Sequence, residues 1–175
     1  MKLESKNIKL RALEPEDLEF LFQTENNSNF WEVSSTQIPF SKYILTQYIA
    51  NSHQDIYEAK QLRLIVEHQN QPIGMIDLFN FNPQHKRAGI GILIIKEFQQ
   101  KGFASESLTL FIKYAFKTLQ LHQIYANITS DNKNSIALFN SHKFEKIGVK
   151  KDWVYTDNNF KDEILFQLIN NKTNE

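Results

Sequence analysis

The chain lacks cysteine, net charge and any long apolar run, and each absence excludes a class of protein. Without cysteine there are no disulfides, no thiolate metal ligands and no thiol nucleophile, and the composition fits a reducing compartment. Lysine plus arginine equals aspartate plus glutamate at 20 each, so no net field attracts nucleic acid or a membrane surface. No apolar run approaches membrane-spanning length and the N-terminus has no apolar signal core, so we expect a cytoplasmic protein.

The residues that are present indicate one globular domain. The chain has 175 residues, 41% of them apolar and 23% charged, which suffices for a core without a metal or a disulfide. We find neither an internal repeat nor a linker. We therefore expect a single α+β domain over residues 1–170, followed by a polar tail at 171–175.

Periodicity predicts the order of the elements. Alternation and short apolar runs indicate strands at 8–13, 62–67, 73–81, 90–95, 123–129, 144–155 and 160–169. Three- and four-residue apolar spacing and helix-start residues indicate helices that begin near Pro15, near Ser41, at 104 (ending at 119) and after 131–134. Turns are expected at 69–72 and 157–159.

The stretch from Gln99 to Ser105 lies between a predicted strand and the longest predicted helix. In that geometry the first N–H groups of the helix have no internal acceptor, and with the positive end of the helix dipole they form a site for phosphate or pyrophosphate. Gly102 lets the backbone approach a ligand closely, and Lys101 adds a positive charge. The alternative is an ordinary strand-to-helix turn. Other nucleotide-binding motifs are missing, because there is no Walker-type loop and Gly89-Ile90-Gly91 lacks a third glycine.

Two motifs resemble those of a known family. Gln99-x-x-Gly102-x-Ala104 at a helix start resembles the Gln/Arg-x-x-Gly-x-Gly/Ala loop of the GNAT N-acetyltransferases, which holds the pyrophosphate of acetyl-CoA. Asn134-Ser135-x-x-Leu138, followed by Lys143-Phe144, resembles the family segment Asn-x-x-Ser/Ala-x-x-Leu-Tyr-x-x-x-Gly-Phe, whose asparagine contacts the cofactor. The predicted element order is also that of the family. Residues 82–88, 98–104 and 155–160 are most similar to the branch of ribosomal-protein N-terminal acetyltransferases and bacterial spermidine N-acetyltransferase.

The resemblance implies a fold, an activity and a cofactor site. The fold is the GNAT (acyl-CoA N-acyltransferase) fold, a mixed, mostly antiparallel, twisted sheet of about seven strands flanked by about four helices. The activity is transfer of an acetyl group from acetyl-CoA to a primary amine, directly within a ternary complex and without a metal. The implied cofactor-binding residues are Ile92, Leu93, Ile94, Gln99, Gln100, Lys101, Gly102, Phe103, Ala104, Ser105, Asn134 and Phe139.

The implied cofactor site makes a demand on the sheet. The pantetheine arm would pair with residues 92–94, so their strand must splay from the strand at 123–129. Gly89 and Gly91 would permit a bulge near that point, the alternative being only a weak stretch of strand.

The reaction needs a base for the amine, an acid for the departing thiolate and a donor for the oxyanion. We assign the oxyanion donor to a backbone N–H near Leu93. The family tyrosine thought to act as the acid is Phe139 here, which cannot donate a proton and is expected to pack in the core. Lys143 replaces the motif glycine, so the helix before it is expected to end without a left-handed residue.

Three segments offer a base or an acceptor site. Asp77 lies on a predicted strand between apolar residues, where an inward-facing carboxylate would act as the base; the alternative is a carboxylate that faces solvent or pairs with a lysine or arginine. His85 is a candidate base, because an imidazole exchanges protons near neutral pH, and is also placed among the substrate-binding residues; it sits in a turn, where a surface histidine is the alternative. Glu32 beside Trp31 lies in the loop that by resemblance borders the acceptor site, and would bind a cationic amine; the alternative is an ordinary loop. No histidine spacing indicates a metal site.

Two acceptors stay open, a small amine and the N-terminus of a protein. Between residues 26 and 61 the only acidic residues are Glu32, Asp55 and Glu58, mixed with lysines, which argues against a dedicated polyamine enzyme. The missing tyrosine leaves a second class open, a non-catalytic domain that binds acyl-CoA. Assembly into a homo-oligomer also stays open.

Overall fold

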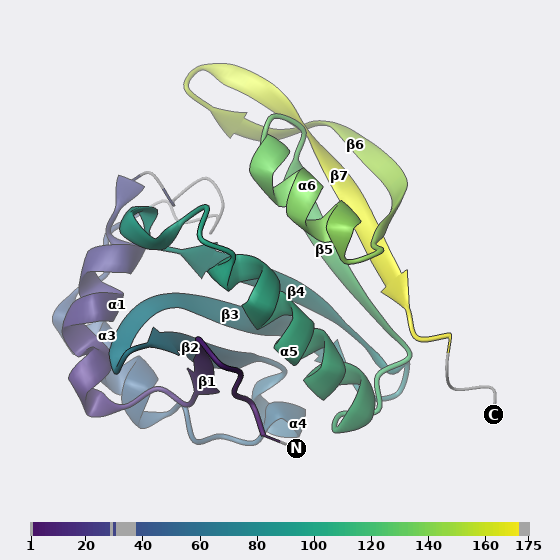
Figure 1. Cartoon of the computed structure of the whole chain (residues 1–175). Helices are drawn as coiled ribbons and strands as arrows, with labels where there is room; N and C mark the ends of the chain where they lie inside the picture. Colours follow the sequence, from purple (N-terminus) through teal and green to yellow (C-terminus); the bar gives the residue numbers. More distant parts are fainter. Residues whose placement is uncertain (1, 29, 31–37, 172–175) are drawn as a thin grey trace.

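One seven-stranded sheet forms the centre of the molecule (Figure 1). The computed structural model describes residues 2–28, 30 and 38–171, and its strands lie in the order β1-β2-β3-β4-β5-β7-β6. Only β4 and β5 are parallel neighbours, which confirms the predicted mixed, mostly antiparallel sheet. The strands are β1 (Lys9–Arg11), β2 (Leu62–His68), β3 (Gln71–Asn82), β4 (Arg87–Ile94), β5 (Gln123–Thr129), β6 (Glu145–Thr156) and β7 (Asn159–Ile169).

Helices cover both faces of the sheet. On one face α1 and α3 bury Leu21 and Leu45 against Met75 of β3. On the other face α5 buries Leu108 and Phe111 in a larger core that includes α6. The described helices are α1 (Leu18–Glu25), α3 (Lys42–Ala50), α4 (Ile56–Ala59), α5 (Phe103–Lys117) and α6 (Lys133–Ser141). Among them α4, a single turn, is the one that periodicity did not predict, because four residues are too short to show it.

Two local features differ from the sequence-based expectation. The β2–β3 turn consists of Gln69 and Asn70, with φ of 50° and 60°, and is tighter than the predicted turn over 69–72. Lys143 follows α6 with φ of 65°, so the expectation that no left-handed residue would end this helix was wrong. A lysine adopts this conformation at a cost of about 1–2 kcal/mol.

The two parallel strands at the middle of the sheet diverge. They pair only from Arg87↔Gln123 to Gly89↔Tyr125, after which β4 continues to Ile94 and β5 to Thr129 without pairing. Figure 1 shows β5, β7, β6 and α6 leaning away from the rest of the molecule, so that the strands form a V. The predicted splay between these two strands is therefore confirmed.

The predicted bulge is not in β4. Its register with β3 is unbroken from Gly74↔Ile94 to Phe79↔Gly89, and the irregularity lies across from it, between Phe79 and Asn82 of β3. Gly89 has a packing role instead, because a Cβ at this position would overlap the Phe79 ring. That ring meets Tyr125 of β5 edge to face at 6.0 Å and closes the narrow end of the V.

Candidate active site

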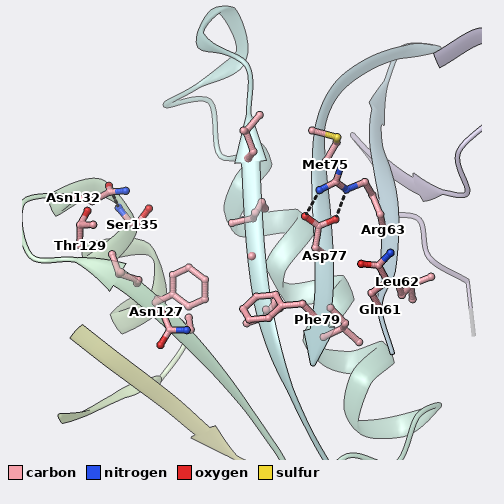
Figure 2. Close-up of a pocket in the computed structure, with 18 of the residues that line it drawn as sticks. Gln61, Leu62, Arg63, Met75, Asp77, Phe79, Asn127, Thr129, Asn132 and Ser135 are labelled. Carbon is pink, nitrogen blue, oxygen red and sulfur yellow. Dashed lines mark hydrogen bonds and ion pairs between the residues drawn. The ribbon is translucent and has the colours of Figure 1, made fainter. Parts of the chain in front are cut away.

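A cavity of about 440 Å³ occupies the opening between β4 and β5 and reaches α1 and α3 on one face of the sheet. Figure 2 shows its two walls, with Asp77 and Phe79 of β3 on one side and the start of α6 on the other. The labelled lining residues are Gln61, Leu62, Arg63, Met75, Asp77, Phe79, Asn127, Thr129, Asn132 and Ser135. The V therefore encloses a binding-sized space rather than a gap filled by side chains.

The β3–β4 register decides which main-chain groups of β4 face this cavity. The N–H of Ile95 donates to the carbonyl of Ile73 at 3.0 Å, and antiparallel pairs alternate between bonded and non-bonded. Leu93 is accordingly a bonded pair with Met75, and its main chain faces β3. The main-chain groups that face the opening are those of Ile92 and Ile94, two of the three strand residues expected to contact a pantetheine arm. The N–H of Leu93 faces β3, so the nearest N–H groups on the open side of β4 are those of Ile92 and Ile94.

The facing edge of β5 is open in the same way. The N–H of Ser130 donates to the carbonyl of Asp162 at 2.9 Å, which fixes Ile128 as a residue bonded to β7. The main-chain groups of Asn127 and Thr129 are then directed into the cavity. Two unpaired strand edges thus face each other across the V.

The loop before α5 presents a second set of N–H groups. Gly102 is the N-cap residue, with φ of 86°, and no side chain caps the helix. No described residue accepts a hydrogen bond from the N–H groups of Gln100 to Ser105. Gln99 anchors the loop, because its Nε2 donates to the carbonyl of Ile94 at 2.8 Å. Free N–H groups and the positive end of a helix dipole together form an arrangement that favours an anion.

The remaining loop residues divide into exposed and packed ones. Lys101 is exposed, and its Nζ lies 5.1 Å from the centre of the Phe98 ring. Phe103 points inward and packs 4.5 Å from the His68 ring, so its side chain supports the loop and only its N–H faces outward. Ala104 is half-buried, which keeps the helix start free of bulky side chains.

The start of α6 places a different asparagine in the site from the one the motif suggested. Asn132 lines the cavity and caps the helix, accepting from the N–H of Ser135 at 3.1 Å, whereas Asn134 is exposed and does not line the cavity. The family spacing Asn-x-x-Ser, counted back from Ser135, indicates Asn132, so the sequence carried this signal. Phe139 lies on the same helix face, lines the cavity, and packs edge to face on Phe144 at 4.9 Å. Its expected place in the core is confirmed.

Asp77 faces the cavity and is paired. Its Oδ1 accepts from Nε of Arg63 at 2.7 Å, and its Oδ2 accepts from Nη2 at 3.1 Å. Arg63 also bonds Glu25 at the end of α1, and its guanidinium lies 5.6 Å from the ring centre of Tyr48. Burial on its own lowers the pKa of Arg63, but the charge and hydrogen bonds of Asp77 raise it well above its usual range. Burial raises the pKa of Tyr48, which keeps the phenol neutral.

The other predicted site residues lie elsewhere. His85 is in the β3–β4 turn at the closed end of the V, where its N–H donates to Asn82 Oδ1 at 2.9 Å, and it does not line the cavity. Trp31 and Glu32 lie outside the described residues. Glu163 of β7 lines the cavity without having been predicted, and is paired with Lys150 Nζ at 2.6 Å.

Two further properties concern the described residues only. They contain no cluster of three or more histidine, aspartate or glutamate side chains able to hold a metal ion. Their helices include none long and apolar enough to cross a membrane.

Comparisons with known proteins identify the family. The acetyltransferase (GNAT) domain model matches residues 7–145. Spermidine N(1)-acetyltransferase of Escherichia coli K12 is 29% identical over 145 residues, which are 81% of this chain and 72% of that protein. The [ribosomal protein uS5]-alanine N-acetyltransferase of E. coli K12 is 37% identical over 79 residues, 45% of this chain and 41% of the relative.

Solved structures agree with this match. Spermidine N-acetyltransferase from Vibrio cholerae, in complex with CoA and spermine, superposes with a TM-score of 0.85 at 28% identity, and the match covers 94% of this chain and 96% of that one. The sequence and the fold of the chain therefore both agree with one family. The same chain has the splayed β4–β5 pair and the uncapped start of α5 described above. The chain belongs to the GNAT acetyltransferases and is an acetyl-CoA-dependent N-acetyltransferase.

Proposed function

We propose that the chain transfers an acetyl group from acetyl-CoA to a primary amine by direct attack within a ternary complex. The observation that supports this most strongly is the cavity between β4 and β5, which is lined by an unpaired edge of β4. Along the chain, β4 leads from this cavity to the free N–H groups at the start of α5. One end of the site thus fits a diphosphate and the other fits a thioester and an amine.

The cofactor would be held mainly by main-chain groups. The N–H groups from Gln100 to Ser105 would bind the pyrophosphate, with Lys101 adding charge. The N–H and carbonyl groups of Ile92 and the N–H of Ile94 would pair with the pantetheine amides, like an added strand, while the carbonyl of Ile94 stays bonded to Gln99. Asn132, at the opposite wall, offers a side-chain amide to the same arm.

The chemistry assigns a role to each wall of the cavity. Bound acetyl-CoA supplies an activated acetyl thioester. A free primary amine has a pKa of about 10, so it must lose a proton before it attacks, and Asp77, directly or through a water, would receive that proton. The N–H of Ile92 would stabilise the oxyanion as the C–N bond forms and the C–S bond breaks. The nitrogen loses a second proton as the amide forms, and this proton would pass through water to the departing thiolate, because Phe139 cannot protonate it.

The acceptor is proposed to carry a single ammonium, as a small amine or a protein N-terminus does. The relatives named above act on spermidine and on a ribosomal protein. Among the described residues, the carboxylates that line the cavity are Glu25, Asp77 and Glu163, and each is already paired with Arg63 or Lys150. A polyamine with several charges would have to displace these cations, whereas one ammonium would not.

The assay is release of CoA thiol with a panel of amines, together with calorimetric binding of CoA. The panel contains a short peptide with a free N-terminus, the same peptide blocked at its N-terminus, a monoamine and spermidine. Turnover with the free peptide or the monoamine, and none with the blocked peptide, is the expected result. Binding of CoA without turnover of any amine would favour the non-catalytic alternative.

Assembly is a separate proposal. Spermidine N-acetyltransferase from V. cholerae, 28% identical, has a dodecameric structure. We propose that this chain also associates with copies of itself, which light scattering of the purified protein would test. A monomer at all concentrations would contradict it.

A further inference from the structure

We propose that Arg63 is a positioning residue for Asp77, holding the carboxylate toward the cavity and keeping it ready to accept a proton from the amine. The inference rests on the proposed function, in which Asp77 receives that proton. It assigns a role to a residue that no motif indicated, and it joins the helices on one face of the sheet to the chemistry in the opening.

The geometry of the pair is that of a fork. Arg63 on β2 and Asp77 on β3 are directly opposite in the antiparallel register, so their side chains share one face. Two parallel bonds, 2.7 Å from Nε to Oδ1 and 3.1 Å from Nη2 to Oδ2, fix the plane of the carboxylate as well as its position. A lysine would supply the charge but not this orientation.

The side of Asp77 that faces the opening is uncovered. Its partner on β4 is Gly91, and a Cβ built there would have only the Phe79 ring within 4 Å, at 3.9 Å. Arg63 therefore occupies one side of the carboxylate, while a residue without a side chain leaves the other side open to the cavity. Figure 2 shows this pair at the cavity wall.

Arg63 is itself held by the helices. Its Nη1 bonds the carboxylate of Glu25, the last residue of α1, and its guanidinium lies over Tyr48 of α3 at 5.6 Å. The guanidinium thus contacts α1, α3 and β3, and its orientation does not depend on Asp77 alone. Arg63 therefore links helices α1 and α3 to Asp77, the proposed base.

The charged groups around Asp77 predict the direction in which each substitution should shift the pH dependence of activity. Among the described residues, the charged groups that face Asp77 are Arg63 from β2 and Glu25 from α1. The neutral phenol of Tyr48 lies beside them on α3, β4 presents Gly91, and across the cavity Glu163 is paired with Lys150. Arg63→Met would take the nearest positive charge away from the Asp77 carboxylate, whereas Glu25→Gln would leave Arg63 to Asp77 alone. The two changes should therefore shift the activity in opposite directions along the pH axis.

A second arginine provides a matched control. Arg11 of β1 also joins two carboxylates, with bonds of 2.7 and 2.9 Å to Asp17 and a further bond to Glu67. None of these residues lines the cavity. Arg11→Met thus removes an equivalent cluster without touching the proposed site.

The experiment measures kcat against pH for one amine at saturating concentrations of both substrates, with CoA affinity and Tm recorded for each variant. In Arg63→Met the acidic limb should move to higher pH by about one unit or more. Arg63→Lys should move it less, and Glu25→Gln should move it to lower pH. Arg11→Met should lower Tm and leave the limb in place.

Three results would overturn the proposal. An Arg63→Met enzyme that loses activity equally at every pH would make Arg63 a structural residue only. A limb that moves equally in Arg11→Met would trace the shift to general destabilisation. An unchanged limb in Asp77→Asn would show that Asp77 does not receive the proton, while turnover and CoA binding by the parent enzyme would leave the acetyltransferase function intact.

Discussion

The two ends of the β4–β5 pair differ in hydrogen bonding and in packing. At the closed end the strands are hydrogen-bonded, and Phe79, Gly89 and Tyr125 fit together without space for a further methyl group. At the open end the same two strands leave main-chain groups unpaired, and polar side chains such as Asp77 and Asn132 line a cavity. A strand edge without partners is unfavourable unless something else satisfies it. We therefore assign the stability of this strand pair to its closed end and ligand binding to its open end.

A negative charge at the open end should have the largest effect. Gly102→Asp puts a carboxylate where we propose that the pyrophosphate binds, and two unit charges about 5 Å apart at an effective dielectric of about 20 repel by about 3 kcal/mol. Calorimetry should show that CoA affinity falls by about 100-fold or more.

Gly102→Ala is the matched control, because it carries the same left-handed strain without the charge. The structure leaves open space beside Gly102, so the added methyl group meets no atom within 4 Å. The alanine variant should retain most of the affinity. Equal losses in the two variants would contradict the assignment of this loop to the diphosphate.

Overpacking the closed end should have an intermediate effect, and on a different property. Gly89→Val would drive a side chain into the Phe79 ring, so the free energy of unfolding should fall by about 1–3 kcal/mol. Urea denaturation measures this. Gly148→Val in β6 is the control, since no atom lies within 4 Å of a Cβ at Gly148. Equal urea midpoints for Gly89→Val and Gly148→Val would contradict the assignment of stability to the closed end of the V.

The local sequence pattern was sufficient to predict the secondary structure at the open end of the V. The change from an apolar run to helical spacing around Gly102 is contained within a short stretch of sequence, so strand, loop and helix could be predicted there. The splay followed from the resemblance, because a pantetheine arm needs a free strand edge. The bulge expected near Gly89 was wrong, because the constraint on that residue comes from Phe79 on another strand, which local sequence does not reveal.

The Arg63–Asp77 pair could not be predicted, because a single residue of register decides it. A turn over 69–72 would pair Arg63 with Leu78 and place Asp77 on the opposite face. The two-residue turn, followed by an irregularity between Val66 and Glu67, pairs Arg63 with Asp77 instead. Of the two alternatives considered for this carboxylate, pairing with an arginine was one and an inward position was the other, and the structure combines them.

Restoring the family tyrosine should have the smallest effect. In Phe139→Tyr a hydroxyl enters the cavity wall and can protonate the departing thiolate. A thiol with a pKa of about 8.5 leaves readily without help, so kcat should rise by less than about tenfold, below the 10²–10⁴-fold typical of general acid–base catalysis. Phe144→Tyr is the control, because Phe144 is equally buried, packs on Phe139 and does not line the cavity. If kcat rises in neither variant, protonation of the thiolate is not the slow step.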